Sequence, residues 1–73
     1  MHAQTLAFEQ KLSLIKRNIR KQIRLNRLTS ACVCKRLGKN RNYLSQMQNP
    51  TLSKLIDISS AIGCRLEDIV CGV

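Results

Sequence analysis

Apolar residues recur in the first third of the chain at the spacing of one helix face. They are separated by four, three, four and four positions: Phe8, Leu12, Ile15, Ile19 and Ile23. Such steps return to one side of a helix, so the pattern predicts an amphipathic helix that is capped by Thr5 and ends near Arg27. Its other faces are basic and carry Lys11, Lys16, Arg17, Arg20, Lys21 and Arg24. Residues 1–12 are expected to form an N-terminal extension of the packed domain.

Residues 28–48 have the pattern of two short helices joined by a tight turn. Thr29 places a hydroxyl where it can accept hydrogen bonds from the free amides that begin a helix. Val33 and Leu37 then lie four positions apart, on one helix face. Gly38 is the usual type of residue for ending a helix in the left-handed conformation. These residues predict a first short helix followed by a glycine turn.

The second short helix is expected to begin with Asn40 as its cap and to bury Leu44 and Met47. The residues left outside are Arg41, Asn42, Ser45 and Gln46. Arginine pairs with guanine, and asparagine or glutamine pairs with adenine, so these four suit the base edges of DNA. Ordinary exposed polar residues are the alternative interpretation. A helix, a glycine turn and a polar-faced helix are the layout of a helix-turn-helix, here at about residues 29–47.

Two further helices are predicted in the last third of the chain. Thr51 caps the first of them after Pro50, and Gly63 ends it. Its apolar face is broad: Leu52, Leu55, Ile56, Ile58, Ser59 and Ile62. The last helix is short, at about residues 66–71, and has Arg65 instead of a favourable cap at its start. The whole pattern predicts an all-α chain of five helices.

At 73 residues the chain is expected to form one domain, residues 1–73, with a core only just large enough for independent folding. One buried cluster should contain Ile19, Ile23, Leu28, Val33, Leu37, Leu44, Leu55, Ile58 and Ile62. There is no apolar run of about twenty residues for a membrane span and no apolar signal core at the N-terminus. These features predict a cytoplasmic protein.

Charge is distributed unevenly along the chain. Residues 1–27 have a net charge of +6, residues 28–47 of +4 and residues 48–73 of −1, within a total of +9. A chain that is basic over residues 1–47 and near neutral over residues 48–73 is typical of a protein that turns one surface toward a polyanion. A solvated surface whose charge serves solubility is the alternative. A basic amphipathic helix can also lie on a membrane, but residues from Leu28 onward offer its apolar stripe a better partner.

The residues of the two short helices resemble the Cro/C1-type (XRE) helix-turn-helix family. The matching positions are Leu28, Thr29, Val33, Cys34, Leu37, Gly38, Asn40, Leu44, Ser45 and Met47. The resemblance continues through residues 49–52 and through Ile58, Ala61, Ile62 and Gly63. It covers about residues 15–70. One departure is the connection between the second short helix and Asn49-Pro50, which is several residues shorter than in the family.

The resemblance implies a compact five-helix domain like that of lambda repressor, and a small phage- or prophage-type regulator. It puts base contacts at Arg41, Asn42 and Gln46. Ser45 is added to them because it lies on the same outward face of the second short helix. Contacts to DNA phosphates are assigned to Thr29, Ser30, Lys39, Asn40 and Tyr43, with Arg20, Arg24 and Arg36 as further candidates. It also implies a homodimer on a palindromic operator, through Leu66, Ile69, Val70 and Val73. Dimerisation through Leu6 and Phe8, or use of the C-terminal residues in the monomer's own core, are the alternatives.

Cysteines and other reactive groups do not suggest catalysis or metal binding. Cys32 and Cys34 point to different sides of a helix, and His2 is the only histidine. Cys34 is expected to be a small buried residue, Cys64 a turn residue, and Cys32 and Cys71 partly exposed thiols. No nucleophile–base pairing or glycine-rich phosphate loop is visible. We therefore expect no enzyme, no metal, no cofactor and no small-molecule substrate.

Two functions remain from the sequence. The first is sequence-specific binding of double-stranded DNA by a transcriptional regulator, a repressor that occupies its operator because the chain has no room for an effector domain. The second is a protein-interaction module with the same fold, which would bind another regulator as an antitoxin or anti-repressor does.

Overall fold

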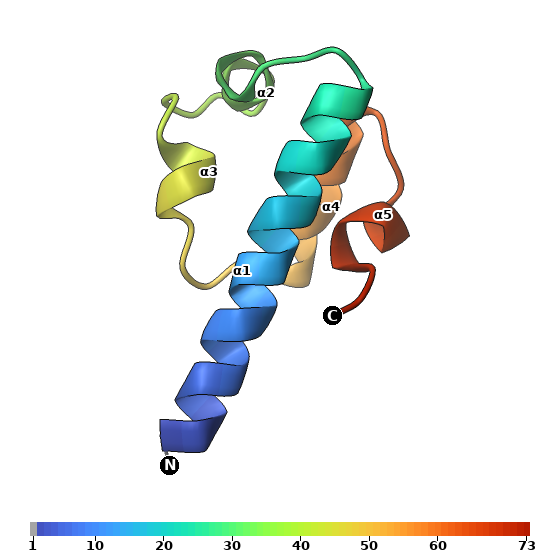
Figure 1. The fold of residues 1–73 in the computed structure, drawn as a ribbon. Helices are drawn as coiled ribbons and strands as arrows, with labels where there is room; N and C mark the ends of the chain where they lie inside the picture. The colour runs from blue at the N-terminus through green and yellow to red at the C-terminus, as the bar shows by residue number, and fades with distance from the viewer. Residues whose placement is uncertain (1) are drawn as a thin grey trace.

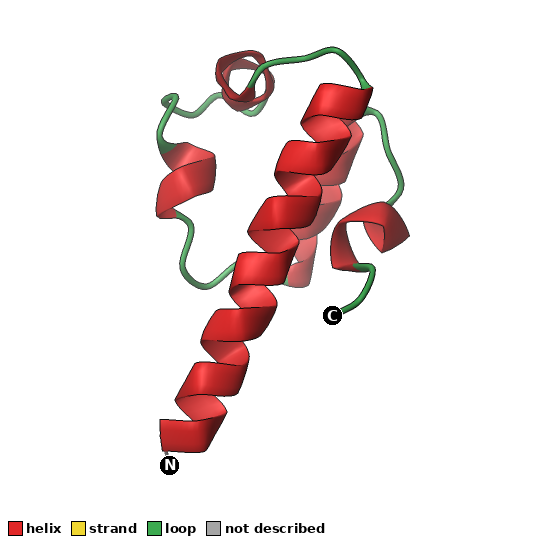
Figure 2. Cartoon of the chain, viewed as in Figure 1, coloured by secondary structure: helices red, strands yellow, loops and turns green. Residues whose placement is uncertain are grey.

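Five helices make up the structure, a computed structural model that describes the backbone of residues 2–73 and the side chains of residues 9–73. They are α1 (His2–Leu25), α2 (Ser30–Arg36), α3 (Tyr43–Gln46), α4 (Leu52–Ile62) and α5 (Leu66–Val70). Figure 1 shows α1 as the long central element, with α2 and α3 on one side and α5 on the other. Residues 2–73 contain helices, turns and loops without any strand, as Figure 2 shows, so the predicted all-α class and five helices are confirmed.

The core lies where α1 meets the other helices. Its members are Ile19, Ile23, Val33, Cys34, Leu44, Met47, Leu55, Ile58, Ile62 and Ile69, each less than 9% exposed. Seven of the nine residues expected in this cluster are buried, and the other two, Leu28 and Leu37, are partly buried against it. The predicted burial of Cys34 and Met47 is also confirmed. Helical spacing therefore identified the inward faces of α1, α2, α3 and α4.

Helix α1 begins earlier in the chain than its predicted cap. Thr5 lies within the helix, which begins at His2 and extends past the other elements in Figure 1. At the other end the helix stops at Leu25, and Arg27 adopts a left-handed conformation with φ of 57°. The amide of Leu28 then donates to the carbonyl of Ile23 at 2.9 Å, which satisfies a terminal carbonyl of the helix. The expected end near Arg27 is therefore confirmed, whereas the expected cap is wrong.

Helix α4 is capped locally at both ends, as predicted. The hydroxyl of Thr51 accepts a hydrogen bond from the amide of Lys54 at 3.2 Å, and Gly63 follows the helix with φ of 91°. Its inward face is narrower than the apolar pattern suggested. Leu52 is 63% exposed and Ile56 is 45% exposed, because both lie on the side of α4 that no other described element covers.

Helix α5 packs against α1 and α4 and brings the end of the chain back to the core. The buried side chain of Asn18 donates from Nδ2 to the carbonyls of Ile69 at 2.7 Å and Cys71 at 2.8 Å. Arg65 provides no side-chain cap, but its amide donates to Asp68 Oδ2 at 3.1 Å. A carboxylate inside the first turn therefore replaces the missing cap, a contribution that the sequence interpretation overlooked.

The structure corrects one of the predicted dimer residues. Ile69 has no exposed side-chain surface and belongs to the core of its own chain, so it is not available to a second copy. Leu66 and Val70 are partly buried, and Val73 is 44% exposed. The alternative, in which the C-terminal residues complete the monomer's core, therefore holds for Ile69.

No helix within residues 2–73 combines the length and the apolar character that a membrane crossing requires.

Candidate nucleic-acid interface

Helices α2 and α3 are joined by a turn with well-defined ends. Thr29 caps α2, since its hydroxyl accepts a hydrogen bond from the amide of Cys32 at 3.1 Å. After α2 the chain reverses at Gly38, which has φ of 72°. The amide of Lys39 then donates to the carbonyl of Cys34 at 2.9 Å, closing the last turn of the helix. The predicted cap and the predicted glycine turn are both confirmed.

Helix α3 is a single turn, shorter than the polar stretch that surrounds it. It begins at Tyr43, two residues later than a cap at Asn40 predicts. The Oδ1 atom of Asn40 nevertheless accepts a hydrogen bond from the amide of Asn42 at 2.9 Å, so Asn40 stabilises the turn that leads into α3. Leu44 and Met47 are buried as predicted and fix the inner side of this turn to the core.

A lysine of α1 holds the C-terminal end of α3. Lys16 Nζ donates to the carbonyl of Ser45 at 2.9 Å, across 29 positions of sequence. A cation at this end of a helix is favourable because the carbonyls there carry partial negative charge. The hydroxyl of Ser45 donates in turn to the carbonyl of Asn42 at 3.0 Å. The apolar periodicity could not identify Lys16 as a positioning residue, because the pattern places Lys16 among the basic residues on the outer faces of α1.

The four residues expected to face DNA bases are all exposed, and the structure brings them together around α3. Arg41 and Ser45 lie on the side of α3 next to α1, where they line one hollow. Gln46 lines a second hollow, on the side next to α4. Asn42 lines neither, and its place in the turn puts it between the two. The α3 segment is therefore a polar ridge with a hollow along each side.

The hollow next to α1, here called the α1-side hollow, is small and basic. It has a volume of about 70 Å³ and is lined by Lys16, Ile19, Arg20, Ser30, Arg41, Leu44 and Ser45. A shallower depression continues from it past Arg20 to Arg24, Thr29 and Ser30 at the start of α2. Three cationic side chains therefore meet beside the exposed start of a helix, where free amides also favour an anion.

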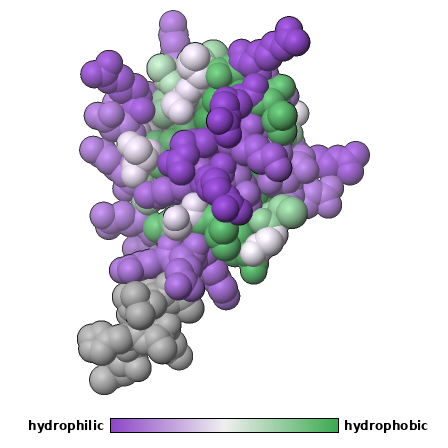
Figure 3. Space-filling view, in the orientation of Figure 1, coloured by the Kyte–Doolittle hydropathy of each residue, from purple (hydrophilic) through white to green (hydrophobic). Residues whose placement is uncertain are grey.

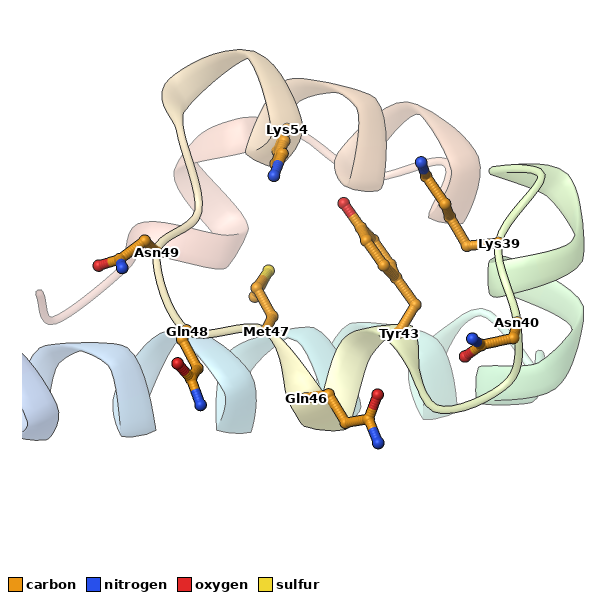
Figure 4. A pocket seen from close by; sticks show the side chains of 8 residues that line it. All are labelled: Lys39, Asn40, Tyr43, Gln46, Met47, Gln48, Asn49 and Lys54. Carbon is orange, nitrogen blue, oxygen red and sulfur yellow. The ribbon is translucent and has the colours of Figure 1, made fainter.

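The hollow next to α4, here called the α4-side hollow, is wider and is shown in Figure 4. It has a volume of about 330 Å³ and is lined by Lys39, Asn40, Tyr43, Gln46, Met47, Gln48, Asn49 and Lys54. Lys39 Nζ lies 5.6 Å from the centre of the Tyr43 ring, within the range of a cation–π contact. Lys54 reaches the same hollow from α4 and was not among the residues predicted to contact phosphate.

The linings of both hollows are free of acidic residues. None of the four, Glu9, Asp57, Glu67 and Asp68, lines either hollow or the depression beside α2. Among the described side chains one ion pair occurs, between Arg65 and Glu67 on α5. Figure 3 views the face over α1, where hydrophilic side chains predominate. The positive charge around α3 is therefore not neutralised by the described residues.

Arg36 is separated from the other candidate phosphate contacts. Its Nη1 atom donates to the carbonyl of Ala61 at 2.8 Å, and it lines a different depression with Asp57. Of the three arginines left open by the sequence, the structure places Arg20 and Arg24 beside the predicted phosphate contacts Thr29 and Ser30, and Arg36 away from them.

The cysteines lie where their positions in the helices put them. Cys34 is buried, Cys32 and Cys64 are partly exposed, Cys71 is exposed, and all four are free thiols. Burial, with a smaller contribution from the charge of Asp68, raises the pKa of the Cys64 thiol. Within the described part of the chain, no three histidine, cysteine or acidic residues gather as metal ligands would.

The chain was compared with models of protein families, with curated proteins and with solved structures, and none of the three comparisons finds a match.

Proposed function

We propose that the protein binds double-stranded DNA in a sequence-specific way and regulates transcription. One observation carries the proposal: a polar ridge at α3 lies between two hollows lined by cations, and the described acidic residues are all elsewhere. A surface of this kind suits a polyanion whose charged strands run on either side of a groove. The resemblance of residues 15–70 to the Cro/C1-type helix-turn-helix family supports the same function and a fold like that of lambda repressor.

In the proposed complex α3 enters the major groove. Arg41, Asn42 and Gln46 are exposed and offer the donors and acceptors that read base edges there. Ser45 has already committed its hydroxyl proton to Asn42, so it acts on a base as an acceptor. Phosphate contacts on one side come from Thr29 and Ser30, assisted by the basic side chains of the α1-side hollow.

The proposed mode of action is repression by a homodimer that occupies a palindromic operator. One turn of helix covers few base pairs, and two copies with half-sites about 34 Å apart give the specificity that one copy lacks. Val73, with the partly exposed Leu66 and Val70, is the proposed contact. Sedimentation should show two chains per operator, and Val73→Asp should weaken the second binding step. One chain per operator at saturation would refute the dimer.

Selection of bound duplexes from random DNA tests the function directly. A consensus half-site should emerge, and the affinity for it should fall steeply with salt. The logarithm of the binding constant falls by about 0.9 for each tenfold increase in salt per phosphate neutralised. A protein that enriches no sequence and binds duplexes only at low salt would contradict the proposal.

Exposed apolar residues on α4 favour a second function. Leu52 and Ile56 lie one turn apart, and both are largely exposed, as the protein-interaction alternative requires. Such an interface should tolerate salt and should be disrupted by Ile56→Glu. If the selected DNA site is bound equally well by Ile56→Glu, this apolar pair plays no part in DNA binding.

A further inference from the structure

Three donor groups from three separate segments meet in the α4-side hollow. Lys39 comes from the turn after α2, Tyr43 from α3 and Lys54 from α4. In Figure 4 the two lysine side chains lie on either side of the hydroxyl end of Tyr43, whereas Gln46 projects the other way. The Tyr43 ring is held in place because it packs against the core, and Lys39 lies over it at 5.6 Å from the ring centre.

These donors have no partners among the described residues. Neither lysine forms an ion pair there, since the described ion pair is Arg65–Glu67. No acidic residue lines the hollow, and the other polar residues that line it, Asn40, Gln46, Gln48 and Asn49, are neutral. Two ammonium groups beside a phenolic hydroxyl, with no neutralising acid, form an environment that favours an anion with several oxygens.

The short connection after α3 brings Lys54 to this place. Only residues 47–51 separate α3 from α4, so the first turn of α4, which contains Lys54, follows α3 closely in the chain. The amide of Lys54 donates to the hydroxyl of Thr51 at 3.2 Å, so Lys54 belongs to the capped first turn of α4. Lys54 of α4 therefore lines the same hollow as Lys39 and Tyr43.

We propose that Lys39, Tyr43 and Lys54 together bind one phosphodiester group of the DNA backbone. This inference rests on the proposed function, because the phosphate belongs to the duplex whose bases α3 contacts. Gln46 lies on the opposite side of α3 from the two ammonium groups in Figure 4, so one turn of helix separates base contact from phosphate contact. The sharing of one phosphate by two lysines is the distinguishing feature of the site.

The test measures affinity against salt for Lys39→Gln, Lys54→Gln and the double variant, on the duplex selected by the unaltered protein. The slope is that of the logarithm of the binding constant against the logarithm of the salt concentration. If both lysines bind one phosphate, this slope should become shallower by about 0.9 in the double variant, whereas it should become shallower by about 1.8 if they bind two separate phosphates. Tyr43→Phe should weaken binding several-fold without changing the slope. Lys21→Gln is the matched control, because Lys21 is exposed on α1 and lines none of the described hollows.

Replacing single phosphates of the duplex by neutral methylphosphonates locates the contact. One position should weaken the unaltered protein and leave the double variant unaffected. A slope loss near 1.8, no slope loss, or a loss equal to that of Lys21→Gln would overturn the shared site while leaving DNA binding intact. Failure of the unaltered protein to select any duplex would instead overturn the proposed function, and the shared site with it. Thermal melting of each variant confirms that it is folded.

Discussion

Helices α3 and α4 follow one another in the chain but differ in what stabilises them. Helix α4 has eleven residues, a threonine cap at its start and a left-handed glycine after its end, and it buries Leu55, Ile58, Ser59 and Ile62. Helix α3 has four residues, no side-chain cap at its first position and one buried residue of its own. Tyr43 packs partly against the core, and the other supports, Met47 and Lys16, lie outside the helix, with Lys16 coming from α1.

The difference shows which of the two helices could form from local signals. A single turn fixes several backbone angles for few hydrogen bonds and is unfavourable alone. Helix α3 therefore exists because the core and α1 hold it, whereas α4 contains its own start, stop and apolar face. Of the residues proposed to read DNA, Ser45 and Gln46 lie on the element that depends most on its neighbours, and Arg41 and Asn42 lie in the turn that leads into it. Changes remote from the DNA should thus affect binding through α3.

The largest expected effect is the loss of stability on truncating the α3 anchor. Leu44→Ala should lower the free energy of unfolding by about 2–5 kcal/mol, because it leaves a cavity where α3 meets the core. Leu55→Ala, which removes an equally buried leucine from α4, is the matched comparison. Thermal and denaturant unfolding measure both. A Leu44→Ala protein that melts like the parent would mean that α3 is not anchored by this residue.

The next effect concerns DNA binding, and it distinguishes the role of an exposed residue of α3 from that of the residues that anchor the helix. Gln46→Ala should weaken binding to the selected DNA site by about 1–3 kcal/mol and relax the preference at one base pair. Stability should hardly change, because Gln46 is exposed. Gln10→Ala, on the exposed surface of α1, is the control. Equal losses on selected and random duplexes would show that Gln46 does not read a base.

A smaller effect tests whether α4 is specified locally. Thr51→Ala removes the hydroxyl that accepts from the amide of Lys54 and should cost about 1 kcal/mol of unfolding free energy. Thr51→Ser keeps a hydroxyl and should recover most of the loss. Chemical denaturation of the two variants provides the comparison. If Thr51→Ala and Thr51→Ser were equally stable, the cap would not contribute.

The smallest effect on stability, and the sharpest test of the contrast, comes from Lys16. Lys16→Met removes the hydrogen bond to the carbonyl of Ser45, an exposed contact worth about 0.5 kcal/mol. Amide exchange should become faster at Gln46, whose amide donates to the carbonyl of Asn42 at the start of α3, and stay unchanged at Leu55 in α4. Faster exchange in both helices would instead indicate a general loss of stability.

Local signals predicted most of the fold but only part of the site. Thr29, Gly38, Thr51 and Gly63 were identified correctly because a cap or a left-handed turn depends on nearby backbone groups. The exposure of Arg41, Asn42, Ser45 and Gln46 followed from their spacing around Leu44.

Some errors were local, namely the caps expected at Thr5 and Asn40 and the overlooked Asp68. The others concern contacts between distant parts of the chain. The exposure of Leu52 and Ile56 and the burial of Ile69 depend on which helices pack against α4 and α5. Lys16 and Lys54 were missed because their roles depend on α3 lying beside α1 and α4. A lysine on an exposed helix face has no local feature that reveals such a neighbour.

The two hydrogen bonds of Asn18 have a consequence for synthesis of the protein on the ribosome. They join the middle of α1 to carbonyls 51 and 53 positions further along the chain. While the chain is being made, α1 to α4 leave the ribosome before Asn18 has its acceptors. Until residues 69–71 are free to pack, the Asn18 amide has no acceptor and the core lacks the Ile69 side chain. Completion of the fold awaits the final helix.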